Sequence, residues 1–214
     1  MMKLLCVLLF ASTCLGVEKS SKYQCTIEPE NKLSFKNMED SCKEKLASQI
    51  KVEVQASLMY LGMGAHFARD IINRPGFSKF FFESANEERE HAIKLIEYLL
   101  MRGQLVTNIN KILQFPLLTK NQTRQEWNTG INSLKYALKL ESSVTEKIKA
   151  IIKSCETNSQ DYHLVDYLSG EFLEEQYKGE RDLAGKISTL GKMIKEENYL
   201  GEFLFDKKLL NGEV

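Results

Sequence analysis

Residues 75–99 read PGFSKFFFESANEEREHAIKLIEYL and have the spacing of a long amphipathic helix. The apolar face of this helix consists of Phe77, Phe81, Leu95 and Leu99. Proline suits the first turn of a helix, where an N–H group would have no partner, so Pro75 marks its start. Glycine favours the position just after a helix, so Gly103 marks its end. Glu88 and His91 interrupt the apolar face three residues apart, a spacing that lets a carboxylate and an imidazole bind one metal ion.

Three further segments have helical periodicity, at about residues 39–67, 129–157 and 162–195. A short amphipathic segment, 199–210, follows the last of them. Residues 104–128 show no sustained period and contain Pro116, which predicts a long connection. Short turns inside each helix pair and one long connection between the pairs predict an all-α four-helix bundle with a single crossover and a short fifth helix.

The composition excludes several classes of protein. The chain has 214 residues with 29 basic and 29 acidic side chains, so it has no excess positive charge for nucleic acid. Hydrophobic residues make up 43% of the chain, which is typical of a globular protein and not of a disordered one.

The N-terminus has the pattern of a secretory signal peptide, MMKLLCVLLFASTCLG, over residues 1–16. The alternative is a buried N-terminal strand. It accounts less well for the lysine near the start, the apolar run and the small residue Gly16 at the end of this segment. Residues 17–38 then form an N-terminal extension, and 39–214 form the folded domain. No later segment has the apolar length of a membrane helix, so we expect a secreted protein without a membrane span.

Polar side chains occupy the apolar faces of all four predicted helices near mid-length. They are Glu53 and Tyr60 on the first helix, Glu88 and His91 on the second, Glu141 on the third and Gln176 on the fourth. Burying several ionised carboxylates is costly unless cations compensate them, and these faces contain no lysine or arginine. Carboxylates with one imidazole suit iron or manganese better than zinc.

Each of these polar residues also has a simpler interpretation. A single glutamate at the edge of an apolar stripe commonly reaches water. Glu87, at the border of its face, is either a ligand for ions in transit or a solvated carboxylate. We expect His66 and His163, near helix ends, to be structural. The three consecutive phenylalanines at 80–82 are expected to pack in the core.

Five strings in the chain resemble those of ferritin heavy chains. Residues 50–60, IKVEVQASLMY, resemble the first helix of that family, and 86–92, NEEREHA, resemble its E-E-R-E-H-A signature. The strings ALKLE (137–141), FLEEQ (172–176) and EFLFDK (202–207) follow in the family's order. The signal peptide, extra cysteines and long connection are similar to the secreted ferritins of insects.

The resemblance implies a di-iron ferroxidase centre inside the bundle. The implied ligands are Glu53, Glu88, His91, Glu141 and Gln176, with Tyr60 beside them. Glu53 and His91 would bind one iron, Glu88 would bridge both irons, and Glu141 would hold the second. The implied reaction oxidises Fe(II) with dioxygen. The ferric mineral would accumulate inside a shell of twenty-four subunits, built from this chain and a second, light-chain-like type.

The residues expected at the pores of such a shell depart from the family's pattern. Threefold pores of ferritins usually have an acidic pair, whereas this chain has Asp166 followed by Ser169. Leu200, Leu204 and Lys208 would face the other symmetry axis, where the lysine would disfavour cations. The route by which iron enters is therefore left open.

Three cysteines remain once the signal peptide is removed. In a single-crossover bundle the first helix begins where the third ends, which predicts a disulfide between Cys42 and Cys155. Cys25 is expected to link to a neighbouring subunit, with a free thiol as the alternative. Asn121 begins an N-Q-T sequon, so we expect a glycan there unless the sequon is unused.

Three other functions are compatible with a helical bundle. A light-chain-like subunit would build the shell without oxidising iron, but it would lack several of the ligands present here. A secreted cytokine would need two long crossovers, and this chain offers one. Other di-iron carboxylate proteins commonly have a second E-x-x-H motif, which the fourth helix does not contain.

Overall fold

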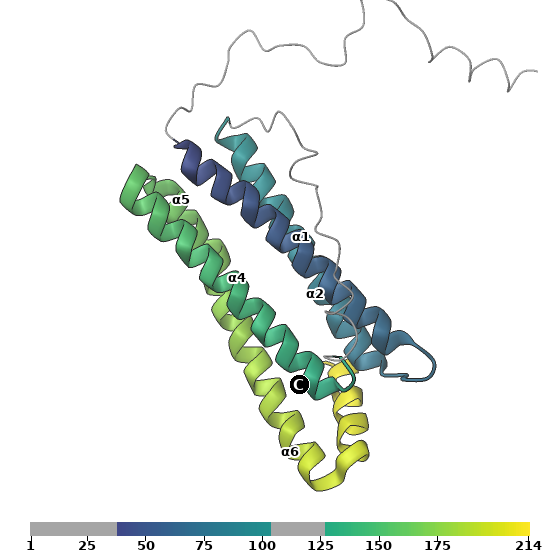
Figure 1. Ribbon diagram of the computed structural model, residues 1–214. Helices are drawn as coiled ribbons and strands as arrows, with labels where there is room; N and C mark the ends of the chain where they lie inside the picture. Colours follow the sequence, from purple (N-terminus) through teal and green to yellow (C-terminus); the bar gives the residue numbers. More distant parts are fainter. Residues whose placement is uncertain (1–37, 104–126) are drawn as a thin grey trace, which may run out of the picture. The chain divides into compact units, whose positions relative to one another are not determined.

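Long helices make up the described part of the chain, in which the computed structural model has no strand (Figure 1). The described residues are 38–103 and 127–214, without the side chains of residues 196–198. The long helices are α1 (Asp40–Ala68), α2 (Pro75–Met101), α4 (Gly130–Ser159) and α6 (Glu174–Leu210). Between α4 and α6 lie the short helix α5 (Tyr162–Tyr167) and the π-helical turn η1 (Leu168–Leu173). None of the helices in these ranges has the length and apolar composition to cross a membrane. The all-α prediction is confirmed.

Helices α2 and α4 begin and end at residues that carry local end signals. Pro75 is the first residue of α2, and Gly103 follows its end with a φ of 66°. The Thr129 side chain caps α4 by accepting a hydrogen bond from the Asn132 N–H. Gln160 ends α4 in the left-handed conformation, with a φ of 51°.

The helices form two pairs, α1 with α2 and α4 with α6, which also pack against each other. Arg102 follows α2 and forms a bidentate ion pair with Asp161, which follows α4. At the opposite end, Glu202 accepts a hydrogen bond from the Gly130 N–H and pairs with Arg74, which precedes α2. Because α2 ends where α4 also ends, the chain has to cross the bundle before α4 begins. Residues 104–126, between α2 and α4 in the sequence, lie outside the described residues, and Asn121 is among them.

A disulfide joins the two helices that the topology brings together at one end. Cys42 in α1 and Cys155 in α4 are bonded, with their Cα atoms 5.6 Å apart. The Ser159 hydroxyl lies 3.1 Å from Cys42 Sγ. Cys25, which is predicted to link this chain to a neighbouring subunit, lies outside the described residues. The predicted signal peptide lies outside them as well.

Two hydrophobic clusters fill the bundle, one toward each end. The first includes Ile50, Ala92, Val144 and Phe172. The second includes Met59, Ala85, Ala137 and Leu183. Glu53 on α1, Glu88 and His91 on α2 and Glu141 on α4 each fall between positions of the two clusters, and Gln176 falls between Phe172 on η1 and Leu183 on α6. Tyr60 belongs to the second cluster. The carboxylates therefore form a polar layer across the middle of an otherwise apolar core.

The fourth helix differs from the continuous helix predicted over residues 162–195. It is interrupted by η1, a wider turn that contains Gly170, and α6 then continues to Leu210. Figure 1 shows the yellow end of α6 turning back on itself. A Cβ atom on Gly201 would lie 2.4 Å from the Met193 carbonyl oxygen, so only glycine permits this close approach. The part of α6 after the bend corresponds to the predicted fifth helix.

The returning part of α6 supplies hydrogen-bond acceptors to two other helices. Asp206 Oδ1 accepts from the Phe77 N–H at 3.0 Å, in the first turn of α2, which has no side-chain cap of its own. Glu202 Oε2 accepts from the Gly130 N–H at 2.9 Å, in the first turn of α4. Carboxylates at helix N-termini stabilise the unpaired N–H groups there. This explains why the segment docks at this end of the bundle.

One apolar side chain lies elsewhere than predicted, and a second is exposed beside it in the same way. Phe82 is 36% exposed although it was expected in the core, and Leu61 on α1 is 49% exposed. Each residue follows a buried aromatic one, Tyr60 and Phe81, and a step of one residue rotates a side chain about 100° around the helix. The Phe82 ring instead covers the backbone of α1 at Gly64.

Candidate metal centre

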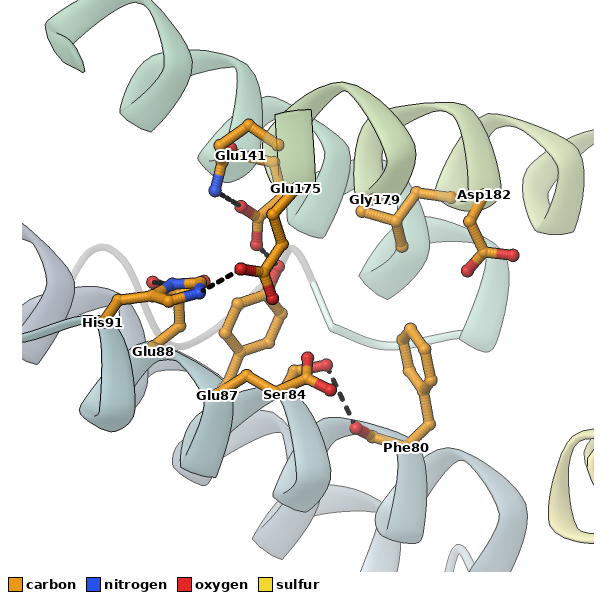
Figure 2. Close-up of a pocket in the computed structure, with 12 residues that line it drawn as sticks. Phe80, Ser84, Glu87, Glu88, His91, Glu141, Glu175, Gly179 and Asp182 are labelled. Carbon is orange, nitrogen blue, oxygen red and sulfur yellow. Dashed lines mark hydrogen bonds and ion pairs between the residues drawn. The ribbon is translucent and has the colours of Figure 1, made fainter. Parts of the chain in front are cut away.

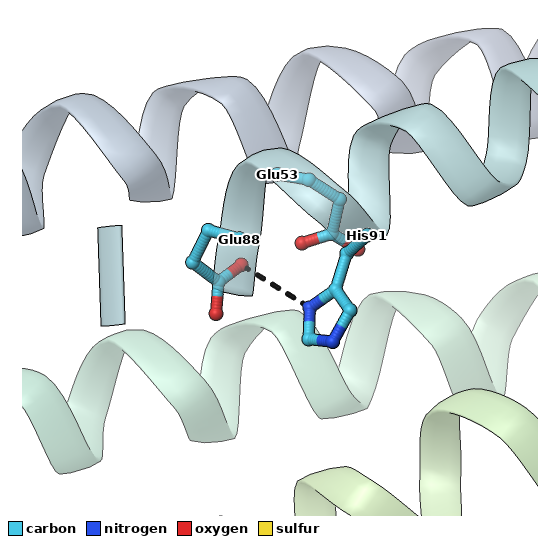
Figure 3. A group of neighbouring side chains, drawn as sticks. All are labelled: Glu53, Glu88 and His91. Carbon is cyan, nitrogen blue, oxygen red and sulfur yellow. Dashed lines mark ion pairs between the residues drawn. The ribbon is translucent and has the colours of Figure 1, made fainter. Parts of the chain in front are cut away.

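Three predicted ligands meet in the polar layer. Glu53 from α1 and Glu88 and His91 from α2 each offer one ligand atom, and these atoms all lie within 4.8 Å of one another (Figure 3). All three side chains are buried, and Glu53 is fully enclosed. The positions of these residues on the apolar faces of α1 and α2 therefore place two carboxylates and one imidazole at the same depth in the bundle.

These side chains have polar atoms without hydrogen-bond partners among the described residues. The unpaired atoms are Glu53 Oε2, Glu88 Oε2 and His91 Nδ1. A buried polar atom without a partner costs about 1–3 kcal/mol, and more when it is charged. Oxygen and nitrogen lone pairs that converge in this way suit a divalent cation, which would satisfy all of them together.

A second carboxylate orients the His91 ring. His91 Nε2 lies 3.2 Å from Glu175 Oε2 on α6, and Nδ1 lies 3.8 Å from Glu88 Oε2 (Figures 2 and 3). A carboxylate beside one ring nitrogen holds a proton there and leaves the other nitrogen free to bind a metal. Glu175 was not singled out from the sequence, although it directly precedes Gln176 in the E-E-Q string. Glu175 also lies 3.9 Å from the Lys94 ammonium group.

Glu141 approaches the same space from α4. The Tyr60 hydroxyl donates to Glu141 Oε1 in a short hydrogen bond, and the Gln176 amide lies 3.0 Å from Glu141 Oε2. All three side chains are buried. Tyr60 from α1 and Gln176 from α6 thus fix the Glu141 carboxylate from both sides.

A cavity of about 110 Å³ has residues of both sets in its lining: Glu88 and His91 from the first, and Glu141 with its hydrogen-bond partners from the second. Its lining includes Glu88, His91, Glu141, Glu175 and Gln176, as Figure 2 shows for the first four. Its remaining residues are Tyr60, Phe80, Ser84, Glu87, Gly179, Asp182 and Leu183. The cavity is large enough for metal ions with a small ligand, and five of its lining residues are acidic: Glu87, Glu88, Glu141, Glu175 and Asp182.

Glu87 lies on the wall of this cavity as a mainly exposed residue. Partial burial raises the pKa of its carboxyl group, and the nearby Glu175 carboxylate adds to the rise. The position fits either of the two roles considered for it, because the side chain has access both to the cavity and to solvent.

Burial raises the pKa values of the carboxyl groups at the centre. Burial raises the pKa of Glu53 well above its ordinary range, and the Glu88 carboxylate adds to this. Burial and the Glu141 carboxylate raise the pKa of Glu88 in the same way. Burial also raises the pKa of Glu141, against hydrogen bonds from Tyr60 and Gln176. A bound cation would displace these protons, since metal ligands have to be deprotonated.

The other residues singled out from the sequence do not join this centre. The ring of His163 lies beside the Tyr98 hydroxyl, 2.9 Å from Nδ1, at one end of the bundle. Asp166 and Ser169 are exposed on α5 and η1. Leu200 and Leu204 are exposed on the returning part of α6, where Lys208 pairs with Glu213.

Comparison with known proteins identifies relatives of this chain. Residues 43–193 match the family model "Ferritin: Ferritin-like domain". The chain is 54% identical to the ferritin heavy chain of Papilio xuthus over 197 residues, which cover 91% of this chain and 92% of that one. It is 51% identical to the ferritin heavy chain of Trichoplusia ni over 97% of this chain and 98% of that one. The solved structure of Trichoplusia ni secreted ferritin matches with a TM-score of 0.80 and 52% identity, covering 90% of this chain and 100% of that one.

Proposed function

This chain belongs to the ferritin family, and from this premise we propose that it oxidises Fe(II) with dioxygen inside its helical bundle and stores the ferric product. Ferritin heavy chains are ferroxidases, and relatives of that type match nearly the whole chain. The observation that carries the proposal is the set of three buried and unpaired ligand atoms on Glu53, Glu88 and His91.

The ligands of the centre form two neighbouring sites for the Fe(II) substrate. Glu53 and His91 Nδ1 bind one Fe(II), Glu88 lies between both sites, and Glu141 binds the second. The support is the convergence of the ligand atoms of Glu53, Glu88 and His91 and the presence of both Glu88 and Glu141 in the lining of one cavity. Gln176 lies beside Glu141 and completes the second site. Tyr60 holds the Glu141 carboxylate by its hydrogen bond.

The chemistry follows from the charge and protons of the centre. Each Fe(II) substrate ion gives up one electron, and dioxygen accepts the electrons. The carboxylates favour Fe(III) over Fe(II), because several negative groups in a buried site stabilise the higher charge more strongly. Entry of iron displaces the protons that burial holds on Glu53 and Glu88, and Glu87 and Glu175 at the cavity wall give these protons a route to solvent.

The subunit is part of a hollow shell of twenty-four chains in the secretory pathway, with a second, light-chain-like type of subunit. The match to a secreted ferritin and the predicted signal peptide over residues 1–16 support secretion. Exposed apolar residues on the returning part of α6 support contacts between subunits: they are Tyr199, Leu200, Phe203 and Leu204.

We infer that Cys25 links neighbouring subunits and that Asn121 is glycosylated. Peptide mapping without reduction tests both assignments.

Iron oxidation by a ligand-deficient variant tests the proposed centre. Replacement of Glu88 and His91 by alanine should leave a folded helical shell and reduce Fe(II) oxidation in air to the rate in buffer. Absorbance of Fe(III) after rapid mixing measures the rate, and sedimentation with circular dichroism checks the shell. Glu90→Ala, at an exposed position of the same helix, is the matched control and should oxidise iron at the parent rate. Oxidation at the parent rate by the double variant would exclude this centre.

A further inference from the structure

A series of polar side chains connects the cavity to Glu180 on α6. Gln176 Nε2 lies 3.0 Å from Glu141 Oε2 on one side, and Gln176 Oε1 lies 3.0 Å from Thr145 Oγ1 on the other. Thr145 Oγ1 lies 2.5 Å from Glu180 Oε1. Ser142 Oγ lies 3.0 Å from Glu180 Oε2. Gln176 and Thr145 are buried, whereas Glu180 is partly exposed.

The single hydroxyl proton of Thr145 sets the direction of these hydrogen bonds. Thr145 has one proton to donate, and oxygens of Glu180 and Gln176 both lie within reach. A carboxylate only accepts hydrogen bonds, and bonds to a charged acceptor are shorter and stronger. The proton therefore goes to Glu180, at the shorter of the two distances. Thr145 Oγ1 is then an acceptor toward Gln176 and needs a donor there.

The Gln176 amide satisfies this need when its NH2 group faces Thr145. The oxygen and nitrogen of an amide occupy nearly equivalent positions, so both orientations fit the same space. In this orientation, which is the reverse of the one in the structure, the Gln176 carbonyl oxygen faces Glu141 and the cavity. Two oxygen acceptors then face each other, which is unfavourable unless a cation or a proton lies between them. A cation bound beside Glu141 gains both oxygens as ligands.

We propose that Glu180, acting through Thr145, is a positioning residue that holds the Gln176 carbonyl oxygen toward the second metal of the centre. This inference rests on the proposed function, because it requires a metal beside Glu141. Neither Thr145 nor Glu180 belongs to the lining of the cavity, so their effect on the metal passes through Gln176. The effect is confined to the second metal, since no described contact links the pair to Glu53 or His91.

Titration of the iron-free, full-length shell with Co(II) tests this inference by visible absorption. Thr145→Val keeps the shape of the side chain and removes its hydroxyl group. It should raise the dissociation constant of the second Co(II) about tenfold, the equivalent of one hydrogen bond. The dissociation constant of the first Co(II) should stay within about twofold. Thr145→Ser should restore the parent value, and Glu180→Ala should match Thr145→Val, with no further loss when the two are combined.

Ser142→Ala is the matched control. It removes the other hydrogen bond to Glu180 but leaves the connection through Thr145 intact, so both Co(II) affinities should remain at parent values. A second Co(II) that binds Thr145→Val and Glu180→Ala with parent affinity would overturn the inference. Equal weakening of both ions, or failure of Thr145→Ser to restore binding, would show a structural role and overturn it as well.

The same titration separates this inference from the proposed function. The metal centre is supported if the parent binds two Co(II) ions and the variant with alanine at both Glu88 and His91 binds neither. This result does not depend on the Thr145 variants. A parent that binds no Co(II) at these residues overturns the centre and the positioning role together.

Discussion

Neutralising two buried glutamates should remove a pH dependence from the stability of the iron-free protein. Glu53 and Glu88 are 0% and 4% exposed, and burial followed by neighbouring carboxylates raises the pKa of each. Replacing both by glutamine keeps their shape but removes the titrating group. We expect the parent to lose stability as pH rises, and the double variant to lose much less.

The sign and size of this effect follow from proton linkage. A carboxyl group whose pKa is raised by folding keeps its proton at pH values where the unfolded chain has lost it. Its contribution to stability is complete below the ordinary value of 4.5 and is lost as pH rises through the raised pKa. One such proton is worth about 1.4 kcal/mol per pH unit. Two groups therefore give a slope of at most about 2.8 kcal/mol per pH unit in each subunit.

Denaturation by guanidinium chloride at several pH values from about 5 to 8 measures this slope. Glu146→Gln, at an exposed position of α4, is the control and should keep the slope of the parent. Excess Co(II) should remove the loss of stability in the parent, because the metal replaces the protons. Parallel stability profiles for the parent and the double variant would refute the assignment of the raised pKa values to this site.

Three more predictions concern contacts around the centre and at the bundle ends. Glu175→Gln removes the charge beside His91 Nε2 and should weaken the first Co(II) about tenfold to a hundredfold in the same titration. Asp206→Ala leaves an N–H group of α2 without its acceptor and should lower the free energy of unfolding by about 1–3 kcal/mol. Replacing Cys42 and Cys155 by serine opens a cross-link between residues 113 apart and should lower it by up to about 4.7 kcal/mol.

Each of these variants has a matched control. Glu171→Gln removes a carboxylate near Lys94 that does not contact His91, and it should leave Co(II) binding unchanged. Lys207→Ala, next to Asp206 but exposed, should leave the free energy of unfolding nearly unchanged. Reduction of the parent disulfide should reproduce the loss seen with the serine variant. Parent-like Co(II) binding by Glu175→Gln, or a parent-like free energy of unfolding for Asp206→Ala or for the serine variant, would contradict the contact assigned to that residue.

The positions of the helices could be read from the sequence because their signals are local. Pro75 and Gly103 determine where α2 begins and ends through their own backbone preferences. The 3.6-residue period places Glu53 and Glu88 in line with apolar neighbours on their own helices, without reference to any other helix. Burial of these carboxylates followed from that alignment and was found in the structure.

The role of Glu175 could not be read in the same way. It is exposed and directly precedes Gln176, so its sequence position is typical of a solvated charge. Its approach to His91 depends on the distance and rotation between α2 and α6. The turn η1 precedes it and adds residues to one helical turn, which rotates everything that follows relative to a regular helix.

By itself, the sequence determined the amphipathic helices and a layer of carboxylates in the core, because helical periodicity and end signals act within a few residues. Only the tertiary structure decided how the atoms of that layer are used. Glu141 receives hydrogen bonds from Tyr60 and Gln176, whereas Oε2 of Glu53 and Oε2 of Glu88 have no hydrogen-bond partner among the described residues. These partners come from other helices, and the packing of all four helices together fixes which side chains can reach one another.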